Sequence, residues 1–382
     1  MALNTVSSDR LSTNVKTSNL GTELSKKVGQ SKNLILNGAF LISQRGVSST
    51  TSGYGTVDRF KVQYSGADEA PTQAQADIAS GTTPYTSGFR KALKITNGNQ
   101  TGGAGSNDFI RLSTFLEGQD IANSGWNYLS SSSFITLSFW VKSSVAQNFY
   151  GFIRNTDGTA QQYQFETGSL TADTWTKITK TIPGNSNLNF ANDTGGAFEL
   201  YIHQFAGTDQ TASGVTLNAW ATYSGSAKMP DFTSTWYTTN DATFEITGVQ
   251  LELGQTATDF EHRSVTHELQ LCKRYYQLWV DGSNQFVCFG DMYTATQCDG
   301  GVQLPVEMRA TPTIEANTGN DYYIIYTNAG DSHIDGTLTS FRTHKKAVLW
   351  YAALDDSGQT AGHANRWVTA SASAKIAFSA EL

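Results

Sequence analysis

The chain has 382 residues, which is long enough for two or three hydrophobic cores rather than one small module. Charged residues make up only 15%, whereas 48 Thr, 37 Ser and 35 Gly dominate the polar fraction, as in extracellular or virion-surface proteins. The 38% hydrophobic and 12% aromatic residues suffice for packed cores, which excludes wholesale disorder. The net charge is -7 without dense blocks of Lys or Arg, which excludes the electrostatic footprint of a nucleic-acid binder.

The first ten residues and the cysteines limit the cellular compartments in which we expect the protein. Residues 1–10 (MALNTVSSDR) contain neither a basic segment nor an apolar run, and no stretch reaches the ~18 apolar residues that span a bilayer. We therefore expect no secretion signal and no membrane insertion. Cys272, Cys288 and Cys298 are odd in number and lack CxxC spacing, so we expect buried thiols rather than disulfides or a zinc site.

Residues 1–32 are polar and poor in aromatic residues. Their few apolar side chains recur at spacings of four or five, which fits a short helix or an extended arm: Leu11, Val15, Leu20, Leu24 and Val28. One chain cannot bury so few apolar groups alone, so we expect this arm to gain order from other subunits.

Residues 33–263 are typical of a β-sandwich. In residues 134–142 (FITLSFWVK) apolar and polar side chains alternate, which is the period of a half-buried strand. In the run 244–253 the apolar positions shift by one residue, and we expect a β-bulge at Gly248 to restore the register. Similar short runs, separated by Gly, Asn, Asp and Ser, predict further strands of a sandwich or jelly roll at 148–154, 175–182 and 198–205.

The period changes in residues 264–278 (SVTHELQLCKRYYQL). Ser264 is a suitable N-cap, and one helical face is formed by Val265, Leu269, Cys272 and Tyr276, so we expect the one well-formed helix here. Residues 279–382 return to strand-like runs, at 285–293, 301–309, 322–327, 347–353 and 367–382. The predicted fold is mainly β: an arm at 1–32, a jelly-roll sandwich at 33–263, a linking helix at 264–278 and a distal β-sandwich at 279–382.

Several short segments, taken in chain order, carry a resemblance. The run NLILNGAFLISQRG at 33–46 is followed by Tyr54 and by VDRF at 57–60. Later segments are ITGVQLELG at 246–254, ATDFEHR at 257–263, CKRYY at 272–276 and LPVEMRATP at 304–312. Together they resemble the motifs of a large family of bacteriophage tail-fibre and appendage proteins. Ser43 and Asp259 depart from it, since many members carry Trp and Pro there.

The resemblance implies a module like the carbohydrate-binding jelly rolls, a linking helix and a distal β-domain, assembled as a homotrimeric virion appendage that is released by lysis. Residues 1–32 would then dock to structural proteins of the phage tail or capsid, and residues 279–382 would bind a glycan on the host surface. Jelly rolls of this kind often hold a structural calcium ion, but no aspartate-rich loop supplies an obvious cage here, so we expect no cofactor.

The charged motifs favour structural roles over catalysis. Arginine pairs with carboxylates in bidentate geometry and can pin segments or subunits together. The sequence has no GxSxG, HExxH, GxxxxGK[ST] or GxGxxG motif, and its six histidines lack metal-ligand spacing, so we expect no enzyme and no metal site. Turns, a bulge or ion pairs are therefore expected at Asn37, Gly38, Arg45, Asp58, Arg59, Gly248, Glu261, His262 and Arg263.

Aromatic residues are the better functional lead, because sugar rings pack their apolar C–H faces on Trp and Tyr. Candidate platforms in the first sandwich are Trp126, Tyr128, Trp220, Tyr223, Trp236 and Tyr237. Neighbouring residues of a strand point to opposite faces, so one ring of each adjacent pair at 322–323 and 350–351 should face outward. The predicted ligand-binding residues are Tyr322, Tyr323, Trp350, Tyr351 and Trp367, with Tyr323, Trp350 and Trp367 as the exposed rings on which host binding depends.

Three classes of function follow from the sequence. The leading one is a non-enzymatic tail fibre, with a capsid-attached adhesive head fibre as its close variant. A glycan-cleaving tailspike is the second, although such enzymes normally show a long β-helical repeat region. A carbohydrate-binding module of a secreted enzyme is the third, and the absence of a signal peptide disfavours it.

Overall fold

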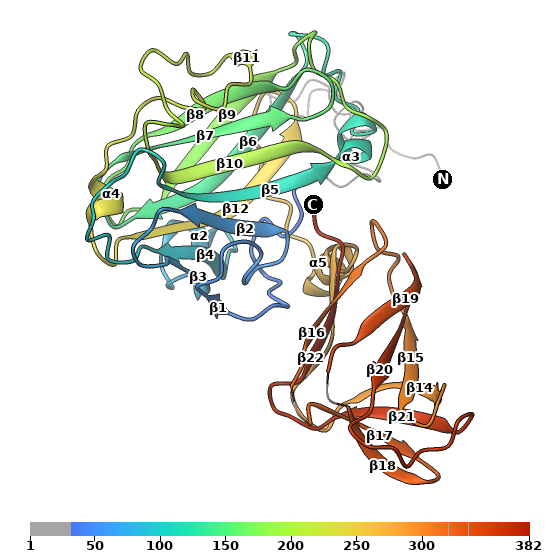
Figure 1. Ribbon diagram of the computed structural model, residues 1–382. Coiled ribbons are helices and arrows are strands. Elements are labelled where there is room, and N and C mark those ends of the chain that lie inside the picture. Colours follow the sequence, from blue (N-terminus) through green and yellow to red (C-terminus); the bar gives the residue numbers. More distant parts are fainter. Residues whose placement is uncertain (1–31, 320, 335) are drawn as a thin grey trace, which may run out of the picture.

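The computed structural model describes residues 32–319, 321–334 and 336–382, which fold into two β units (Figure 1). The arm predicted for residues 1–32 lies outside the described residues, except for Lys32. The described residues form four antiparallel sheets and a few short helices, so the predicted mainly β class is confirmed. In this part of the chain no helix is long and apolar enough to cross a membrane.

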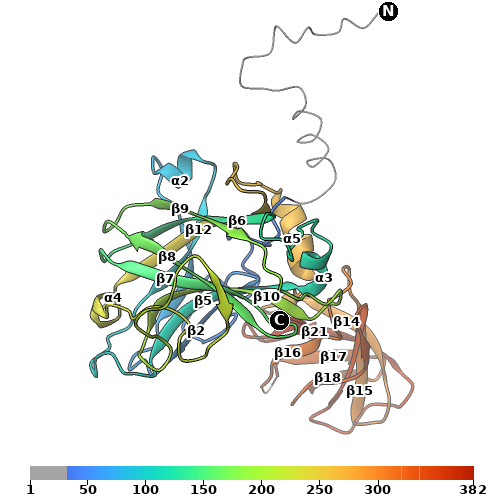
Figure 2. The same cartoon turned by 90° about the horizontal axis from the view of Figure 1, so that it is seen from above.

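The first β unit is a sandwich of two six-stranded sheets, seen stacked in Figure 2. Sheet I has the order β1-β3-β4-β12-β6-β9 and consists of Ser48–Ser49 (β1), Thr72–Asp77 (β3), Lys91–Thr96 (β4), Thr243–Leu253 (β12), Phe134–Ser143 (β6) and Thr176–Pro183 (β9). Sheet II has the order β11-β8-β7-β10-β5-β2 and consists of Trp220–Thr222 (β11), Gln161–Ser169 (β8), Asn148–Asn155 (β7), Gly196–Ala206 (β10), Phe109–Glu117 (β5) and Phe60–Ser65 (β2).

Alternation along the strands builds the core between these sheets. In β6 the side chains of Ile135, Leu137, Phe139 and Val141 are fully buried, as the sequence predicts. The register of β12 against β6 shifts between Thr247 and Gln250, and Gly248 lies there with a φ of 65°. The predicted bulge is thus confirmed, and a glycine is needed because an added Cβ would lie 2.6 Å from the Phe89 ring.

The longest described helix, α5 (Val265–Lys273), begins where the sequence predicts. The Ser264 side chain accepts a hydrogen bond from the backbone N–H of His267, which confirms the N-cap. Its extent was predicted wrongly, since the helix ends at Lys273. Its buried face was predicted only in part: Cys272 and Tyr276 are buried as expected, whereas Val265 is 58% exposed and Glu268 is buried. The other described helices span only four or five residues: α2 (Thr83–Thr86), α3 (Gly118–Ala122) and α4 (Thr235–Thr238).

The second β unit packs a three-stranded sheet against a seven-stranded one. Sheet III has the order β13-β22-β16, from Tyr276–Asp281 (β13), Lys375–Ser379 (β22) and Thr313–Asn317 (β16). Sheet IV has the order β18-β17-β21-β14-β15-β20-β19, from Gly330–Ile334 (β18), Tyr323–Thr327 (β17), Ala364–Thr369 (β21), Phe286–Met292 (β14), Gln297–Gln303 (β15), Ala347–Ala353 (β20) and Thr339–His344 (β19).

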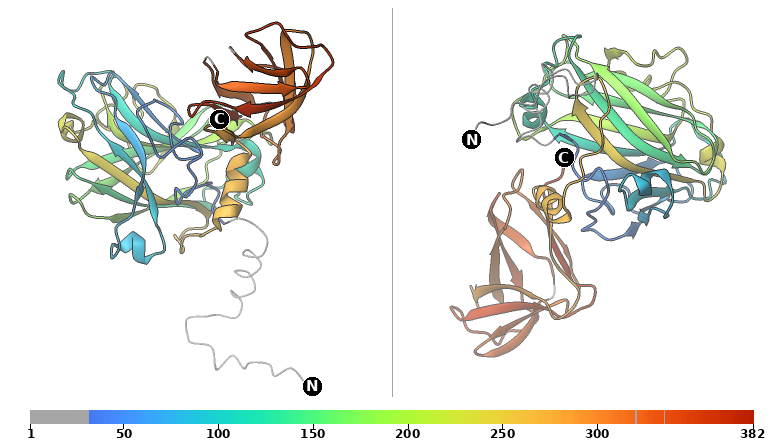
Figure 3. Two further views of the ribbon diagram at one scale, coloured as in Figure 1. Left: turned by 90° about the horizontal axis from the view of Figure 1, so that it is seen from below. Right: turned by 180° about the vertical axis from the view of Figure 1, so that it is seen from behind.

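Two predicted strands of this unit differ from the structure. The run 367–382 forms two strands, β21 and β22, because the chain turns where Ala374 donates a backbone hydrogen bond to Ser371. The run 301–309 leaves the sheet after Gln303, where the backbone N–H groups of Leu304 and Met308 turn to the carbonyls of Lys346 and Lys345. The view from behind in Figure 3 shows α5 between the sandwich and sheet III.

The Asn37-Gly38 turn gives a test of this packing. Asn37 has a φ of 56°, and a Cβ added to Gly38 would lie 2.0 Å from the carbonyl oxygen of Val249. Because that oxygen belongs to the backbone of a central strand, it cannot move aside as a side chain could. We predict that Gly38→Ala lowers the free energy of unfolding by ~1–3 kcal/mol, measured by denaturant titration. Gly225→Ala, where an added Cβ meets nothing within 4 Å, is the control and should change little.

Candidate functional site

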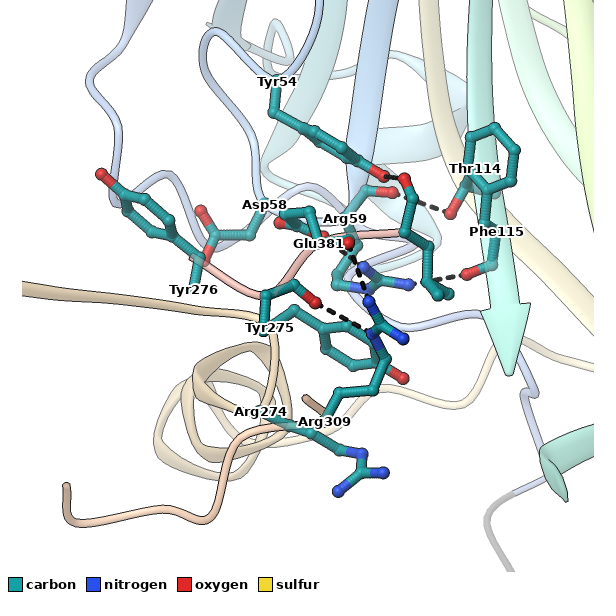
Figure 4. Close-up of polar contacts among 12 residues, drawn as sticks. Tyr54, Asp58, Arg59, Thr114, Phe115, Arg274, Tyr275, Tyr276, Arg309 and Glu381 are labelled. Atoms are coloured by element: carbon teal, nitrogen blue, oxygen red, sulfur yellow. Dashed lines mark hydrogen bonds and ion pairs between the residues drawn. The ribbon is translucent and has the colours of Figure 1, made fainter. Parts of the chain in front are cut away.

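Several of the charged motif residues meet where the two β units touch (Figure 4). Asp58 and Arg59 lie just before β2, Glu117 ends β5, Arg274 and Tyr275 follow α5, and Glu381 follows β22. Segments more than 300 positions apart in the sequence, such as those of Arg59 and Glu381, are therefore in direct contact. We call this group the junction cluster, comprising Arg45, Asp58, Arg59, Glu117, Arg274, Tyr275, Tyr276, Arg309 and Glu381.

Glu381 lies between two arginines of the first β unit. Its carboxylate is paired with Arg59 through a short contact, and Arg45 Nη2 lies 3.2 Å from Glu381 Oε1. The side chains of these three residues are at most 7% exposed. Arg59 also donates a 2.6 Å hydrogen bond to the carbonyl of Phe115. Each of these buried charges thus has partners, as burial requires.

Glu117 forms a second ion pair across the same boundary. Arg274 donates two hydrogen bonds of 2.7 Å to the Glu117 carboxylate, and the Tyr275 hydroxyl donates one of 2.6 Å. Burial alone would raise the pKa of Glu117, but the hydrogen bonds from Arg274 and Tyr275 hold it below its usual range. Glu117 is therefore a firmly ionised acceptor.

The two adjacent tyrosines after α5 stack on arginines of the first β unit. The Arg59 guanidinium lies 3.4 Å from the centre of the Tyr275 ring, and that of Arg45 lies 3.6 Å from the Tyr276 ring. Both rings are buried. These contacts begin immediately after the helix ends at Lys273.

Hydrogen bonds from side chains to backbone carbonyls add to the contact between the two β units. Arg309 donates to the carbonyls of Ala380 and Glu381 at 2.9 and 3.0 Å, and to that of Thr194 in the first β unit at 2.7 Å. The Gln44 side chain donates to the carbonyl of Tyr276 at 2.8 Å. Arg309 belongs to the LPVEMRATP segment and Gln44 to the SQRG segment. Both motif segments therefore contribute hydrogen bonds to the boundary between the two β units.

The remaining motif residues connect the start of α5 to residues 33–37. Arg263 pairs with Glu261 at 2.9 Å and Glu268 at 3.4 Å, and His262 Nε2 lies 3.0 Å from the carbonyl of Ser87. Glu261 also accepts the backbone N–H of Asn33 at 2.7 Å. The Asn37 side chain donates to the carbonyls of Ile42 and Asp58, at 2.8 and 2.9 Å, which holds the turn against the cluster. The structural roles expected for these residues agree with this geometry.

The three rings expected to be exposed are buried. Tyr323 is 1% exposed, and Trp350 and Trp367 are 0% exposed, so they cannot stack on a ligand from solvent. The two tryptophan rings pack edge to face at 6.0 Å in the core. They fill the space above Gly300, where an added Cβ would lie 3.2 Å from either ring. In the pair 350–351 the Tyr351 ring is exposed, as expected. In the pair 322–323 neither ring is fully exposed, because Tyr322 is half-buried and packs against the core of the second β unit.

The candidate rings of the first sandwich are also packed. Trp126, Trp236 and Tyr237 belong to its core. Tyr128 and Trp220 are partly buried against that core, and Tyr223 lies against a smaller cluster on the outer side of sheet II.

Instead, the outer face of sheet IV carries the exposed rings. Among the described residues the aromatic side chains that are more than 36% exposed all lie between 286 and 351: Phe286, Phe289, Tyr293, Tyr326 and Tyr351. Phe289, Arg366 and Tyr326 are neighbours across three strands, and the Arg366 guanidinium lies 4.8 Å from the Tyr326 ring. Phe286 and Phe289 were not among the predicted rings. Strict alternation would place two residues three positions apart on opposite faces, and the register shift between Phe286 and Cys288 brings both rings to the outer face.

Three thiols are buried and unpaired, as expected for Cys272, Cys288 and Cys298. Burial raises the pKa of Cys288 and Cys298 to about 12, so these thiols stay protonated and unreactive. Within the described ranges, no group of three or more His, Cys, Asp or Glu side chains is placed to hold a metal ion.

Comparison with known proteins gives similarity in fold only. No family model and no curated protein matches the chain, so the family resemblance stays a prediction. The enzymatically active domain of tailspike protein 4 of bacteriophage CBA120 is 10% identical, with a TM-score of 0.31 over 58% of this chain and 21% of that one. TmCBM61 in complex with β-1,4-galactotriose is 10% identical, with a TM-score of 0.27 over 59% of this chain and 100% of that one. The N-terminal cellulose-binding domain of Cellulomonas fimi β-1,4-glucanase C is 9% identical, with a TM-score of 0.28 over 56% and 98%.

The junction cluster predicts a large effect of removing its central charge. In Glu381→Gln, Arg45 and Arg59 remain buried without a carboxylate between them, which should lower the free energy of unfolding by about 3–5 kcal/mol in denaturant titration. Glu307→Gln is the control, because its pair with Lys346 at 3.3 Å is at least half exposed and should contribute less than ~1 kcal/mol. Equal losses in the two variants would contradict the role of the cluster.

Asp58 predicts a pH dependence of stability. Burial raises its pKa from 3.8 to about 6, although hydrogen bonds from Gln44 and the charge of Arg45 oppose the shift. The folded protein then binds this proton more firmly than the unfolded chain. Protonated Asp58 therefore contributes to the free energy of unfolding below about pH 4, and this contribution is lost as the pH rises through 6. We predict that Asp58→Asn gains stability relative to the parent, by up to ~3 kcal/mol, as the pH rises from 4 to 7. A difference that is constant with pH would contradict this.

Proposed function

We propose that the protein is a non-enzymatic virion appendage, a phage tail fibre that binds a host surface glycan through its C-terminal β unit. The observation that carries the binding role is the concentration of exposed aromatic rings on the outer face of sheet IV. Phe289 is 72% and Phe286 52% exposed, and their ring centres lie 4.9 Å apart. Such rings present flat apolar surface to solvent, which suits the C–H face of a sugar.

Polar groups beside these rings can bind sugar hydroxyls. Asp299 lies directly opposite Asp291 on one side and Tyr351 on the other, so carboxylates and a ring share one row of the face. Arg366 supplies guanidinium donors next to Tyr326. Apolar platforms with a few polar groups are the usual composition of a sugar site.

The virion role rests on the motif resemblance, and the geometry of the motif residues supports it. The motif residues hold the sandwich and the distal β unit together through buried ion pairs. An appendage that experiences mechanical force needs such a rigid connection between its domains. In this proposal residues 1–32 attach the protein to the tail, with capsid attachment as the variant, and the protein is a homotrimer. Repeated copies would turn weak binding at single sites into firm adhesion.

A glycan-cleaving tailspike is the alternative, and the carboxylates of the junction cluster give it no support. Glu117 and Glu381 accept hydrogen bonds from guanidinium groups and are held inside the boundary between the β units. Hydrolysis of a glycosidic bond needs two carboxyl groups ~5–9 Å apart across an accessible cleft, one of them able to donate a proton.

Binding by sheet IV can be tested on a panel of immobilised bacterial surface polysaccharides. We predict that Phe289→Ala and Tyr326→Ala each weaken binding about thirtyfold, since stacking anchors at recognition surfaces contribute ~2 kcal/mol, without lowering the melting temperature. Tyr85→Ala, which removes a half-buried ring from the first sandwich, is the matched control and should bind normally. Unchanged binding by both sheet IV variants would refute the assignment.

A further inference from the structure

Two carboxylates face each other on the outer side of sheet IV. Asp291 on β14 and Asp299 on β15 are direct cross-strand partners. Both occupy outward positions of their strands, since the adjacent residues Met292, Cys298 and Gly300 are buried. Like charges that lie directly opposite one another lower the stability of a sheet, so this pair is unfavourable unless a cation lies beside it.

Neither carboxylate has a cationic partner. Among the described residues no ion pair includes Asp291 or Asp299. Asp299 Oδ1 accepts a hydrogen bond of 3.1 Å from the Gln297 side chain, which is an uncharged donor. Elsewhere in the same β unit a surface carboxylate is paired, as Glu307 is with Lys346 at 3.3 Å. The described part of the chain therefore does not balance the repulsion between the two aspartates.

The centre of this face carries negative charge only. Strands β14, β15 and β20 contain no Lys, Arg or His. Arg366 lies on β21, but its guanidinium is 4.8 Å from the Tyr326 ring on β17, which is on the far side of β21 from β14. Asp331 on β18 lies opposite Tyr326 and adds a further exposed carboxylate. The face thus has a local excess of carboxylates over cations.

Exposed aromatic rings surround the two aspartates. Side chains two positions apart share a face, so Phe289 and Tyr293 flank Asp291 along the chain, and the pairing with β15 continues at Tyr293. The two rings are 72% and 66% exposed. Tyr351 lies directly opposite Asp299 and is also exposed. Aromatic rings and carboxylates attract the same ligand, a cation, and proteins bind ammonium groups with this combination.

A purely structural role does not account for the pair. Charged side chains keep open sheets from associating, but for that purpose they are placed on edge strands. The edge strands of sheet IV are β18 and β19, whereas Asp291 and Asp299 lie on two inner strands. A site for neutral sugars alone does not account for it either, because amide side chains bond to hydroxyls without the repulsion.

We propose that the outer face of sheet IV is selective for a glycan whose sugars carry free ammonium groups. The ammonium group would lie between Asp291 and Asp299, and the sugar rings would pack on Phe289 and Tyr351. The inference rests on the proposed function of this face and adds to it the charge of the ligand. Acidic polysaccharides would be repelled by the same two carboxylates.

The test compares a glucosamine pentamer with the fully N-acetylated pentamer by isothermal titration calorimetry on the full chain. The two ligands share their rings and linkages and differ in charge. In weakly acidic buffer, in which the amines are protonated, we expect the glucosamine pentamer to bind about tenfold more tightly, with an affinity that falls as salt rises. Asp291→Asn and Asp299→Asn should each remove most of this preference. Because each variant removes a repulsive charge, its melting temperature should stay the same or rise.

Two further variants separate the outcomes. Asp173→Asn removes an exposed carboxylate from the first sandwich, at a φ of 55° that asparagine tolerates, and should leave binding unchanged. Phe289→Ala should weaken binding of both pentamers, since the proposed function requires this ring whatever the charge of the ligand.

Equal affinity for the two pentamers, unaffected in both aspartate variants, would overturn the charge selectivity. The proposed function would survive that result if Phe289→Ala still weakens both. Failure of the glucosamine pentamer to bind would overturn the inference as well, and the polysaccharide panel would decide separately on the proposed function. Pentalysine that binds as tightly as the glucosamine pentamer, and is lost in the same variants, would also overturn it, because the face would then attract charge without recognising a sugar.

Discussion

The buried carboxylate of Glu381 between Arg45 and Arg59 is the contact on which the rest of the structure depends. Taking these charges out of water costs several kcal/mol for each ion, and the cost is offset only when all three side chains are in place. The arginines belong to the first β unit and the carboxylate follows the last strand of the second. Separating the units would break these pairs, so the ion pairs couple the folding of the two.

This coupling fixes the position of the second β unit. The junction cluster lies at the end of the sandwich near α3 and α5 (Figures 1 and 2). The outer face of sheet IV, which carries the exposed rings, takes no part in that boundary. A fixed boundary therefore lets this face keep one orientation relative to the sandwich.

Local patterns predicted much of the fold and little of the sites. The bulge at Gly248 and the cap at Ser264 follow from a few neighbouring residues, and both are confirmed. The partner of Arg59 is 322 positions away, so no local pattern could identify it. The exposure of the rings was predicted wrongly. Alternation shows that neighbouring residues of a strand point to opposite faces of the sheet, but it does not show which face is covered by another sheet. Trp350 turned inward and Tyr351 outward once sheet III covered one side of sheet IV.

Differential scanning calorimetry of the full chain tests the central claim most directly, because it reports whether the two β units unfold together. If the buried ion pairs couple them, the chain should show one transition whose calorimetric and van't Hoff enthalpies agree. Two β units joined by a weak contact would unfold independently, as is usual for domains with a small polar interface. Two separate transitions, with the C-terminal unit melting at its own temperature, would contradict the account.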